Sequence, residues 1–582
     1  RLRAAGQQVH ELEAASVEGD EFHAEVLARV RGATAASVTA SLSGALGRQT
    51  HLVTPGNLVT VGGRQVARYR FQHGLFQHYL YGQLDAAARA CLHDAVGAAL
   101  EGMYGDQASQ IAGQLAYHFE AAGQAGKATR YLLEAGQQAA RVGAHRLAVE
   151  HYRRALALLD DLPPSSERTE LEFALQMGLD LSLLYTLGWG APERMRASGR
   201  AYELGQQMSW STPAMLRALR GQADLYAARG EYERATRLAS ELLAAAERAG
   251  APVYVASAQA TLAICATMRG DYAQAWEYAE RALDFAEHPP QALAADDMRT
   301  LRPHADLAAL AVLLLRGYLD RARRHMERIA HNEAWLTPEI ACFTHGSMAL
   351  FYAACHDDQE AQQHAVEALR IVEGRDIPEM QALAEAVLGW AEARAGRCQR
   401  GIERLTAAMA VSTRLGTLTF RFIQLALLVE AHLAGGDTGA AGRAVDEALS
   451  RAEQTGAHNH DAQFWRLRGE VLLRRGQRNG GDVAPDAEAC FERALAIARQ
   501  QGALLYELRA TTSRARLWAQ QGRTGEARAA LAAVYGAFVE GYGAPDLVEA
   551  KALLDSLATD PQAEPMPRDD LAPERGGGRS SW

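Results

Sequence analysis

The chain has 582 residues, of which 48% are hydrophobic, so it is too long for a single core and predicts several domains or one extended array. Its formal net charge of -10 argues against a general affinity for nucleic acid or for an anionic membrane, because both require a basic face. Lysine occurs only at Lys127 and Lys551, and neither fits the P-loop pattern GxxxxGK followed by Ser or Thr.

Residues 1–110 combine helices with strands. The order helix, helix, β-hairpin, helix is the pattern of a winged helix. The second helix, which would enter the major groove of DNA, contains no Arg, Lys, Asn or Gln, so we expect a packing module here. The expected helices are Glu21–Arg31, Ala35–Gly47, Gly74–Gly82 and Asp85–Gly102, and the expected strands are Leu52–Val53, Val59–Val61 and Val66–Phe71.

From about residue 112 onward one pattern recurs: a small residue, an apolar residue four positions later, and a small or apolar residue three positions after that. These offsets lie on one helix face, where small side chains let a second helix approach closely. From Ala235 the copies follow at intervals of 40, 47, 39, 40, 40, 46 and 40 residues, a period typical of helical solenoids. The copies begin at Ala128, Ala148, Ala235, Ala275, Ala322, Ala361, Gly401, Ala441, Ala487 and Ala527.

A glycine five residues before the pattern marks the turn between the two helices of a pair, because Gly permits the left-handed conformation that ends a helix. We therefore expect an all-α fold: a tetratricopeptide-like helical-hairpin superhelix, or solenoid, preceded by a small winged-helix domain with a β-hairpin. The turn glycines are Gly230, Gly270, Gly317, Gly396, Gly436 and Gly522.

The expected division of the chain has five parts. Residues Glu167–Leu187 and Pro192–Met208 predict an irregular helix pair, and Arg478–Pro485 predict a surface loop within one repeat. The parts are a winged helix at 1–110, the first tetratricopeptide helices at 111–165, the irregular pair at 166–212, repeats at 213–558 and a disordered tail at 559–582.

Few motifs carry chemistry. His458, His460 and Asp461 form the densest His/Asp cluster, and we expect a polar loop there rather than a metal site because no fourth ligand is near. His356-Asp357-Asp358 predicts a solvated turn. The cysteines form no CxxC or metal spacing and predict reduced, buried thiols in the cytoplasm. They are Cys91, Cys265, Cys342, Cys355, Cys398 and Cys490.

Four stretches resemble one bacterial group, the STAND signal-transduction ATPases. They are AASVEGDEFHAEVLARV (14–30), RYRFQHGLFQHYLYGQLD (68–85), AYHFEAAGQAGKATRYLLEAGQQA (116–139) and AEACFERALAIARQQGALLYELRATTSRARLWAQQGR (487–523). In this group a winged helix and a long tetratricopeptide array follow an AAA-type ATPase domain, and many members also carry an adenylate/guanylate cyclase or transcriptional-activator domain. Since the chain begins at Arg1, we expect the C-terminal fragment of such a protein.

The resemblance implies a regulatory sensor arm that is not itself an enzyme. It implies an inducer or protein partner on the concave face of the array, contact with the protein's own N-terminal ATPase domain, and nucleotide-driven oligomerisation. No cofactor is expected in this chain, whereas ATP or ADP is implied for the ATPase domain. A histidine at the start of the last winged-helix helix commonly contacts the phosphate of bound ADP in this group, and RFQHGL places His73 there. A capping or core role for His73 is the alternative.

Two other functions stay open at this point. One is a free-standing tetratricopeptide adaptor or transcriptional regulator whose winged helix contacts DNA. The other is an enzyme with an unrecognised site, although no convergent polar cluster in the sequence favours it.

Overall fold

The computed structural model describes residues 9–61, 63–207, 213–289, 295–330, 338–373, 377–480 and 482–558. Contacts divide the chain between Leu225 and Tyr226 into two compact units. The boundaries predicted at residues 110, 165 and 212 remain predictions, and the predicted tail at 559–582 lies outside the described residues. In the part that the structure describes, no helix combines the length and apolarity that a bilayer crossing requires.

The first unit begins with helices around a small antiparallel sheet. The strand order is β1-β3-β2, with the β-hairpin of β2 and β3 where the sequence predicts one. The elements are α1 (Val9–Glu18), β1 (Glu21–His23), α2 (Ala24–Arg31), α3 (Ala35–Ser41), a π-helical segment (Leu42–Gln49), β2 (Val53–Val61), β3 (Arg64–Phe71), α4 (Gly74–Gln83) and α5 (Ala86–Tyr104).

The helix predicted at Glu21–Arg31 is wrong in its first three residues, which form β1. Phe22 is fully buried, lies opposite Tyr69 of β3, and places its ring 5.2 Å from that of Phe71. This aromatic burial outweighs the local helix propensity. The helix predicted at Ala35–Gly47 also differs, because its α-helical part ends at Ser41.

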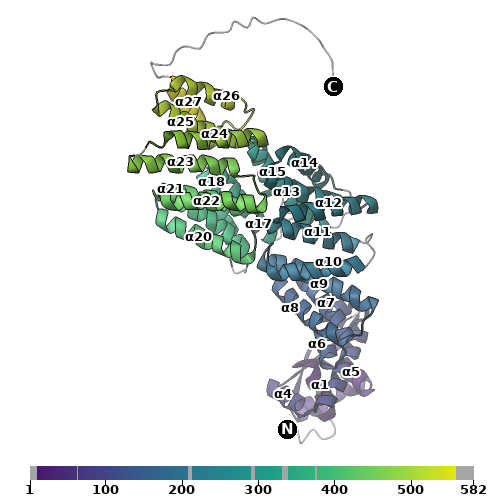
Figure 1. Ribbon diagram of the computed structural model, residues 1–582. Coiled ribbons are helices and arrows are strands. Elements are labelled where there is room, and N and C mark those ends of the chain that lie inside the picture. Colours follow the sequence, from purple (N-terminus) through teal and green to yellow (C-terminus); the bar gives the residue numbers. More distant parts are fainter. Residues whose placement is uncertain are drawn as a thin grey trace, which may run out of the picture. The chain divides into compact units, whose positions relative to one another are not determined.

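The rest of the first unit is a run of antiparallel helices (Figure 1). They include two helices where the irregular pair is predicted, at 166–187 and 192–207. A 3-10 segment at Gly105–Ile111 precedes the run. The helices are α6 (Ala112–Ala121), α7 (Ala125–Arg141), α8 (His145–Leu158), α9 (Ser166–Leu187), α10 (Pro192–Gln207) and α11 (Pro213–Ala228), the last of which crosses into the second unit.

The second unit is a succession of tetratricopeptide-like helical hairpins, so the predicted all-α fold class is confirmed (Figure 1). The loop predicted at Arg478–Pro485 is shorter than expected, because α23 continues to Asn479 and α24 starts at Ala484. The helices are α12 (Tyr232–Ala249), α13 (Pro252–Arg269), α14 (Tyr272–Glu287), α15 (Ala295–Leu315), α16 (Leu319–Ala330), α17 (Pro338–Ala354), α18 (Asp358–Ile371), α19 (Pro378–Arg394), α20 (Cys398–Leu415), α21 (Arg421–Ala434), α22 (Thr438–Thr455), α23 (Asp461–Asn479), α24 (Ala484–Gln501), α25 (Leu504–Gln520), α26 (Thr524–Tyr535) and α27 (Pro545–Ala558).

The recurring pattern lies on the second helix of each hairpin and faces the first. Ala275, Ala279 and Ala282 of α14, for example, are fully buried. The turn glycines adopt the expected left-handed conformation, with φ between 75° and 87° at all six predicted positions. The hairpin formed by α17 and α18 is different, because its turn carries His356 at the equivalent position, with φ 56°.

Helices α19 and α20 approach one another closely. A Cβ built on Gly389 would lie 2.6 Å from the carbonyl oxygen of Gly401, and a Cβ on Gly401 would meet the carbonyl oxygen of Gly389 even more closely. Both positions therefore require glycine for packing rather than for an unusual φ angle.

First helices also contact the first helices of neighbouring hairpins. The pairs α17 and α19, α19 and α21, α21 and α23, α23 and α25, and α25 and α27 are each in contact. They form a continuous layer, which we call the inner layer.

Loops far apart in the sequence meet within the second unit, and we call these meetings the closing contacts. The amide of Leu418 donates to the carbonyl of Ala228 (2.8 Å), and the Tyr272 hydroxyl donates to the carbonyl of Asn459 (2.7 Å). Further along, the amide of Gly541 donates to Asp320 (2.9 Å). The early hairpins thus bind loops that lie much later in the sequence: the separation is 187 residues between Tyr272 and Asn459 and 221 residues between Asp320 and Gly541.

Candidate functional site

A cavity of about 430 Å³ lies against the inner layer of the second unit. Four arginines and three glutamates of the described chain line it, so its wall is mainly charged. The lining residues come from α19, α21, α23, α25, α27 and the turn between α17 and α18. They are His356, Arg394, Glu430, Leu433, Ala434, Arg466, Leu467, Glu470, Arg474, Arg516, Pro545 and Glu549.

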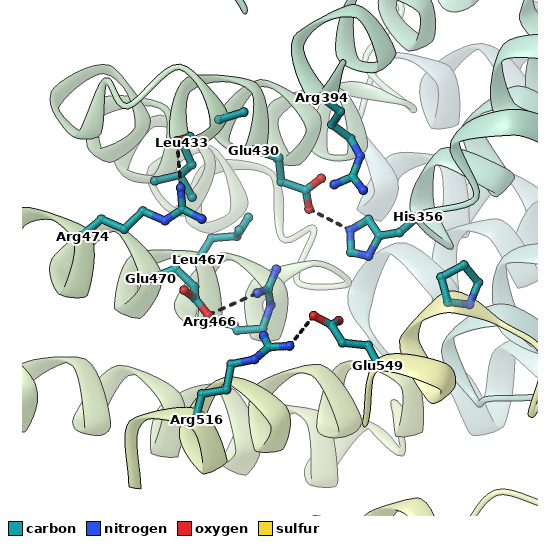
Figure 2. A pocket seen from close by; sticks show the side chains of 12 residues that line it. His356, Arg394, Glu430, Leu433, Arg466, Leu467, Glu470, Arg474, Arg516 and Glu549 are labelled. Carbon is teal, nitrogen blue, oxygen red and sulfur yellow. Dashed lines mark hydrogen bonds and ion pairs between the residues drawn. The ribbon is translucent and has the colours of Figure 1, made fainter. Parts of the chain in front are cut away.

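Most charges in the wall are paired within the protein. Arg394 binds Asp358 with its Nε 2.9 Å from each carboxylate oxygen, and Arg516 binds Glu549. Figure 2 shows Arg516 and Glu549 pointing toward one another across the wall. These pairs fix the rim of the cavity.

Two arginines of α23 are less well matched. Arg466 and Arg474 lie eight residues apart, with Glu470 between them, on one helix face (Figure 2). Arg466 is 3.9 Å from Glu470, the outer limit of an ion pair, and burial lowers its pKa. Arg474 donates to the carbonyl of Leu433 (2.8 Å), and no acidic side chain of the described residues pairs with it. The wall therefore carries a surplus of positive charge.

At one end of the cavity, four charged groups form what we call the ionic cluster: His356, Glu430, Arg509 and Asp546. The imidazole of His356 places Nε2 3.2 Å from Glu430 and Nδ1 3.4 Å from Asp546. Arg509 donates to both oxygens of Asp546 at 2.8 and 2.7 Å. It also donates to the carbonyl of Ala354, which ends α17. The ionic cluster joins the α17–α18 turn to α21, α25 and α27.

The electrostatics of the ionic cluster favour the charged forms. Burial and Arg509 lower the pKa of His356, but Glu430 and Asp546 outweigh them and raise it to about 9. Burial would raise the pKa of Glu430, yet His356, Arg466 and the Trp390 indole N–H bring it down to about 2. Burial would also raise the pKa of Asp546, but Arg509 and His356 outweigh it and hold this pKa well below its ordinary value. His356 is therefore an imidazolium at neutral pH, with an N–H for each carboxylate.

The prediction of a solvated turn at His356-Asp357-Asp358 is wrong for His356. Its side chain is 21% exposed and bridges two acids that are still more buried. Asp357 caps α18 by accepting from the amide of Glu360 (3.4 Å), which is an ordinary turn role. The sequence does contain a signal for this site: a histidine stands where six other hairpins have a turn glycine.

His73 lies at the start of α4, as the sequence predicts, and is exposed. Its side chain makes no capping hydrogen bond, and its ring lies 5.9 Å from that of Phe76. His73 is therefore the N-cap residue of α4 by position, without a hydrogen bond from its side chain, and it is not a core residue. Its predicted contact with a phosphate is untested.

His458, His460 and Asp461 do not converge on one point. His458 binds Asp461 (2.8 Å), whereas His460 lies 2.5 Å from the Tyr506 hydroxyl. Burial, followed by Arg509, lowers the pKa of His460 to about 4. Among the described residues, no three or more His, Cys, Asp or Glu side chains are placed so that they could hold a metal ion.

None of the six cysteines, all of which the structure describes, forms a disulfide. The prediction of buried thiols holds for Cys265, Cys342, Cys355 and Cys490. It is wrong for Cys91, which is exposed on α5.

Comparisons with solved structures give distant likenesses. A Rap protein complexed with competence and sporulation factor is 12% identical, over 64% of this chain and 98% of that chain, with a TM-score of 0.45. A Signal Transduction ATPase with Numerous Domains from Pyrococcus horikoshii, with a tetratricopeptide repeat sensor, is 11% identical over 85% of this chain and 63% of that chain (TM-score 0.32). The APC/C hetero-tetramer Cut9-Hcn1 is 13% identical over 77% and 94% (TM-score 0.30).

No family model matches the chain, and no curated protein matches its sequence. Since the structural likenesses are this low, the type of array rests on the helix contacts described above, and function has to be argued from the cavity.

Proposed function

We propose that the chain is the regulatory and sensing arm of a signal-transduction ATPase, and that the cavity receives part of a protein partner or inducer. The observation that carries this proposal is the charged cavity on the inner layer. A concave face built from several first helices can hold an extended partner, and the surplus of arginine favours an acidic or polar segment. The chain itself has no catalytic role in this proposal.

The N-terminal part supplies the link to the ATPase domain. We propose that the helices and the hairpin at residues 9–104 act as a winged helix that packs over bound nucleotide. The exposed His73, at the start of α4, would then face a phosphate of ADP, where an imidazole N–H and the helix N-terminus both favour negative charge. Binding of a partner at the array would release this arrangement and permit nucleotide-driven oligomerisation.

Measuring phosphate release from ATP tests whether hydrolysis belongs to the ATPase domain and not to this chain. The purified chain alone is expected to release phosphate no faster than buffer, while the protein with its ATPase domain is expected to hydrolyse ATP at a rate that a bound partner changes. Robust ATP hydrolysis by the chain alone would contradict the proposal. An upstream reading frame that encodes no nucleotide-binding domain would contradict it as well.

The role of His73 has its own measurement. In the protein with its ATPase domain, His73→Ala is expected to weaken ADP binding about tenfold, the loss of one hydrogen bond to a charged group. His78→Ala, which alters an exposed histidine of the same helix, is the matched control. Equal ADP affinity in all three proteins, measured by calorimetry, would remove His73 from the nucleotide site.

A further inference from the structure

The turn between α17 and α18 keeps a backbone conformation that suits glycine. His356 has φ 56°, and a residue with a Cβ pays about 1–2 kcal/mol to adopt this left-handed region. Glycine occupies the equivalent turn in six other hairpins. The strain therefore persists here because the imidazole makes contacts that hold it in place.

Those contacts connect elements that are remote in the sequence. Glu430 belongs to α21, and Asp546 lies in the first turn of α27. Arg509 of α25 completes the set by binding both Asp546 and the last carbonyl of α17. Because each nitrogen of the ring faces a carboxylate, the bridge needs the doubly protonated imidazole. Further charged groups near this turn are Arg466, Arg394, Arg323, Asp357 and Asp358.

α27 is one wall of the cavity and the last described helix of the array. It contributes Pro545 and Glu549 to the lining. Its main contacts among the described helices are with α25 and α26, and the apolar side chains that it buries are Leu547, Ala550 and Leu557. A terminal helix with little apolar burial has a lower free energy of local unfolding than the helices inside the array. The ionic cluster is consequently a large part of what holds this wall.

We propose that α27 is a movable wall of the cavity, which the bridge from His356 to Asp546 holds shut. His356 is the positioning residue, since the same imidazole lines the cavity and fixes the wall. Release of α27 would widen the cavity toward the Glu549 side and admit a partner segment. The inference rests on the proposed function only in that the cavity is the partner site; the motion itself does not depend on an ATPase domain.

Hydrogen exchange followed by mass spectrometry tests the movable wall in the full chain. His356→Gly restores the turn residue of the other hairpins and removes the bridge, so the fold is expected to persist, as circular dichroism would check. We expect peptides from 545–558 to exchange at least tenfold faster than in the unchanged chain, while peptides from 252–287 keep their rates. Glu526→Gln on α26, which breaks the exposed pair with the preceding Arg523, is the matched control and should change neither region.

Two outcomes would overturn the movable wall. One is exchange of α27 within twofold of the unchanged chain. The other is an equal rise in every helix, which would give His356 a purely structural role. If circular dichroism shows that His356→Gly does not fold, Asp546→Asn takes its place, and the exchange rates of peptides from 545–558 are compared in the same way. If α27 alone exchanges faster and no ATPase domain is encoded upstream, the movable wall is upheld and the proposed function is wrong. If an ATPase domain is encoded upstream and α27 keeps its exchange rate, the proposed function stands and the movable wall is wrong.

Discussion

At the scale of single residues, the site depends on one histidine that local sequence does not single out. His356 stands before two aspartates, and such a run is typical of a solvated turn. Its partners Glu430 and Asp546 lie 74 and 190 positions further along, so no local pattern can indicate them. Comparison of the turns with one another was the available signal, since a glycine position occupied by histidine marks an exception. His73, by contrast, is located correctly because its helix start is encoded nearby.

His356 also sets a pH dependence of stability. Its pKa is raised in the folded chain from 6.5 to about 9, so its contribution is fully present below pH 6.5 and is lost as the pH rises toward 9. We expect the free energy of unfolding to fall by about 2 kcal/mol over this range, a value reduced for the strong coupling within the cluster. Urea denaturation at pH 6, 7.5 and 9 measures it.

His356→Gly is the comparison for this pH series. It lacks the imidazole and relieves the strained φ, so its stability should not show this fall. The difference between the two proteins is expected to be largest at pH 6 and to shrink by pH 9. Parallel curves would contradict the assignment. Glu430 acts at the other end, because its pKa is lowered to about 2 and its contribution is lost only as the pH falls below 4.5 toward that value.

At the scale of the helix, the sequence specifies more. The small residues of the recurring pattern and the turn glycines locate most helices of the second unit, because both features act within one hairpin. The first unit is less predictable. β1 is set by its pairing with β3, and Phe22 and Tyr69 are 47 residues apart. Helix propensity gives no information about such a partner.

The contact between α19 and α20 gives a test at this scale. Gly401→Ala would force its Cβ against the backbone of Gly389, so we expect a loss of about 2–3 kcal/mol in the free energy of unfolding. Gly442→Ala on α22 is the matched control, because its nearest neighbour would be Val471 at 3.8 Å, and higher helix propensity should stabilise it by about 0.5 kcal/mol. Equal stabilities of the two variants in denaturant titrations would show that α19 and α20 separate easily.

At the scale of the second unit, the closing contacts add a level that repeat patterns do not predict. Each closing contact uses at least one backbone group, which is the same for every residue type, so the repeat pattern does not reveal its partner. The array is therefore not a chain of nearest-neighbour units alone. Elements that are almost five repeats apart in sequence support one another.

The Tyr272 hydroxyl provides the test of this long-range support. Tyr272→Phe removes the donor to the buried carbonyl of Asn459 and should lower the free energy of unfolding by about 1–2 kcal/mol. Hydrogen exchange should then rise in both α14 and the start of α23. Tyr278→Phe on the same helix is the control, because its hydroxyl makes no hydrogen bond among the described residues. A rise confined to α14 would mean that the closing contact carries no stability.

The closing contacts have a consequence for how such an array can change in size. An open solenoid lengthens by one repeat without disturbing the others, because each repeat contacts only its neighbours. Here Ala228 binds Thr419 at a separation of 191 residues and Tyr272 binds Asn459 at 187, so the stretch between them must keep its number of hairpins. A duplicated or deleted repeat inside that stretch would displace, by one hairpin, each closing contact that spans it. The number of repeats is thus itself a structural property of this protein, and variation in length is compatible with the fold only outside the closed stretch.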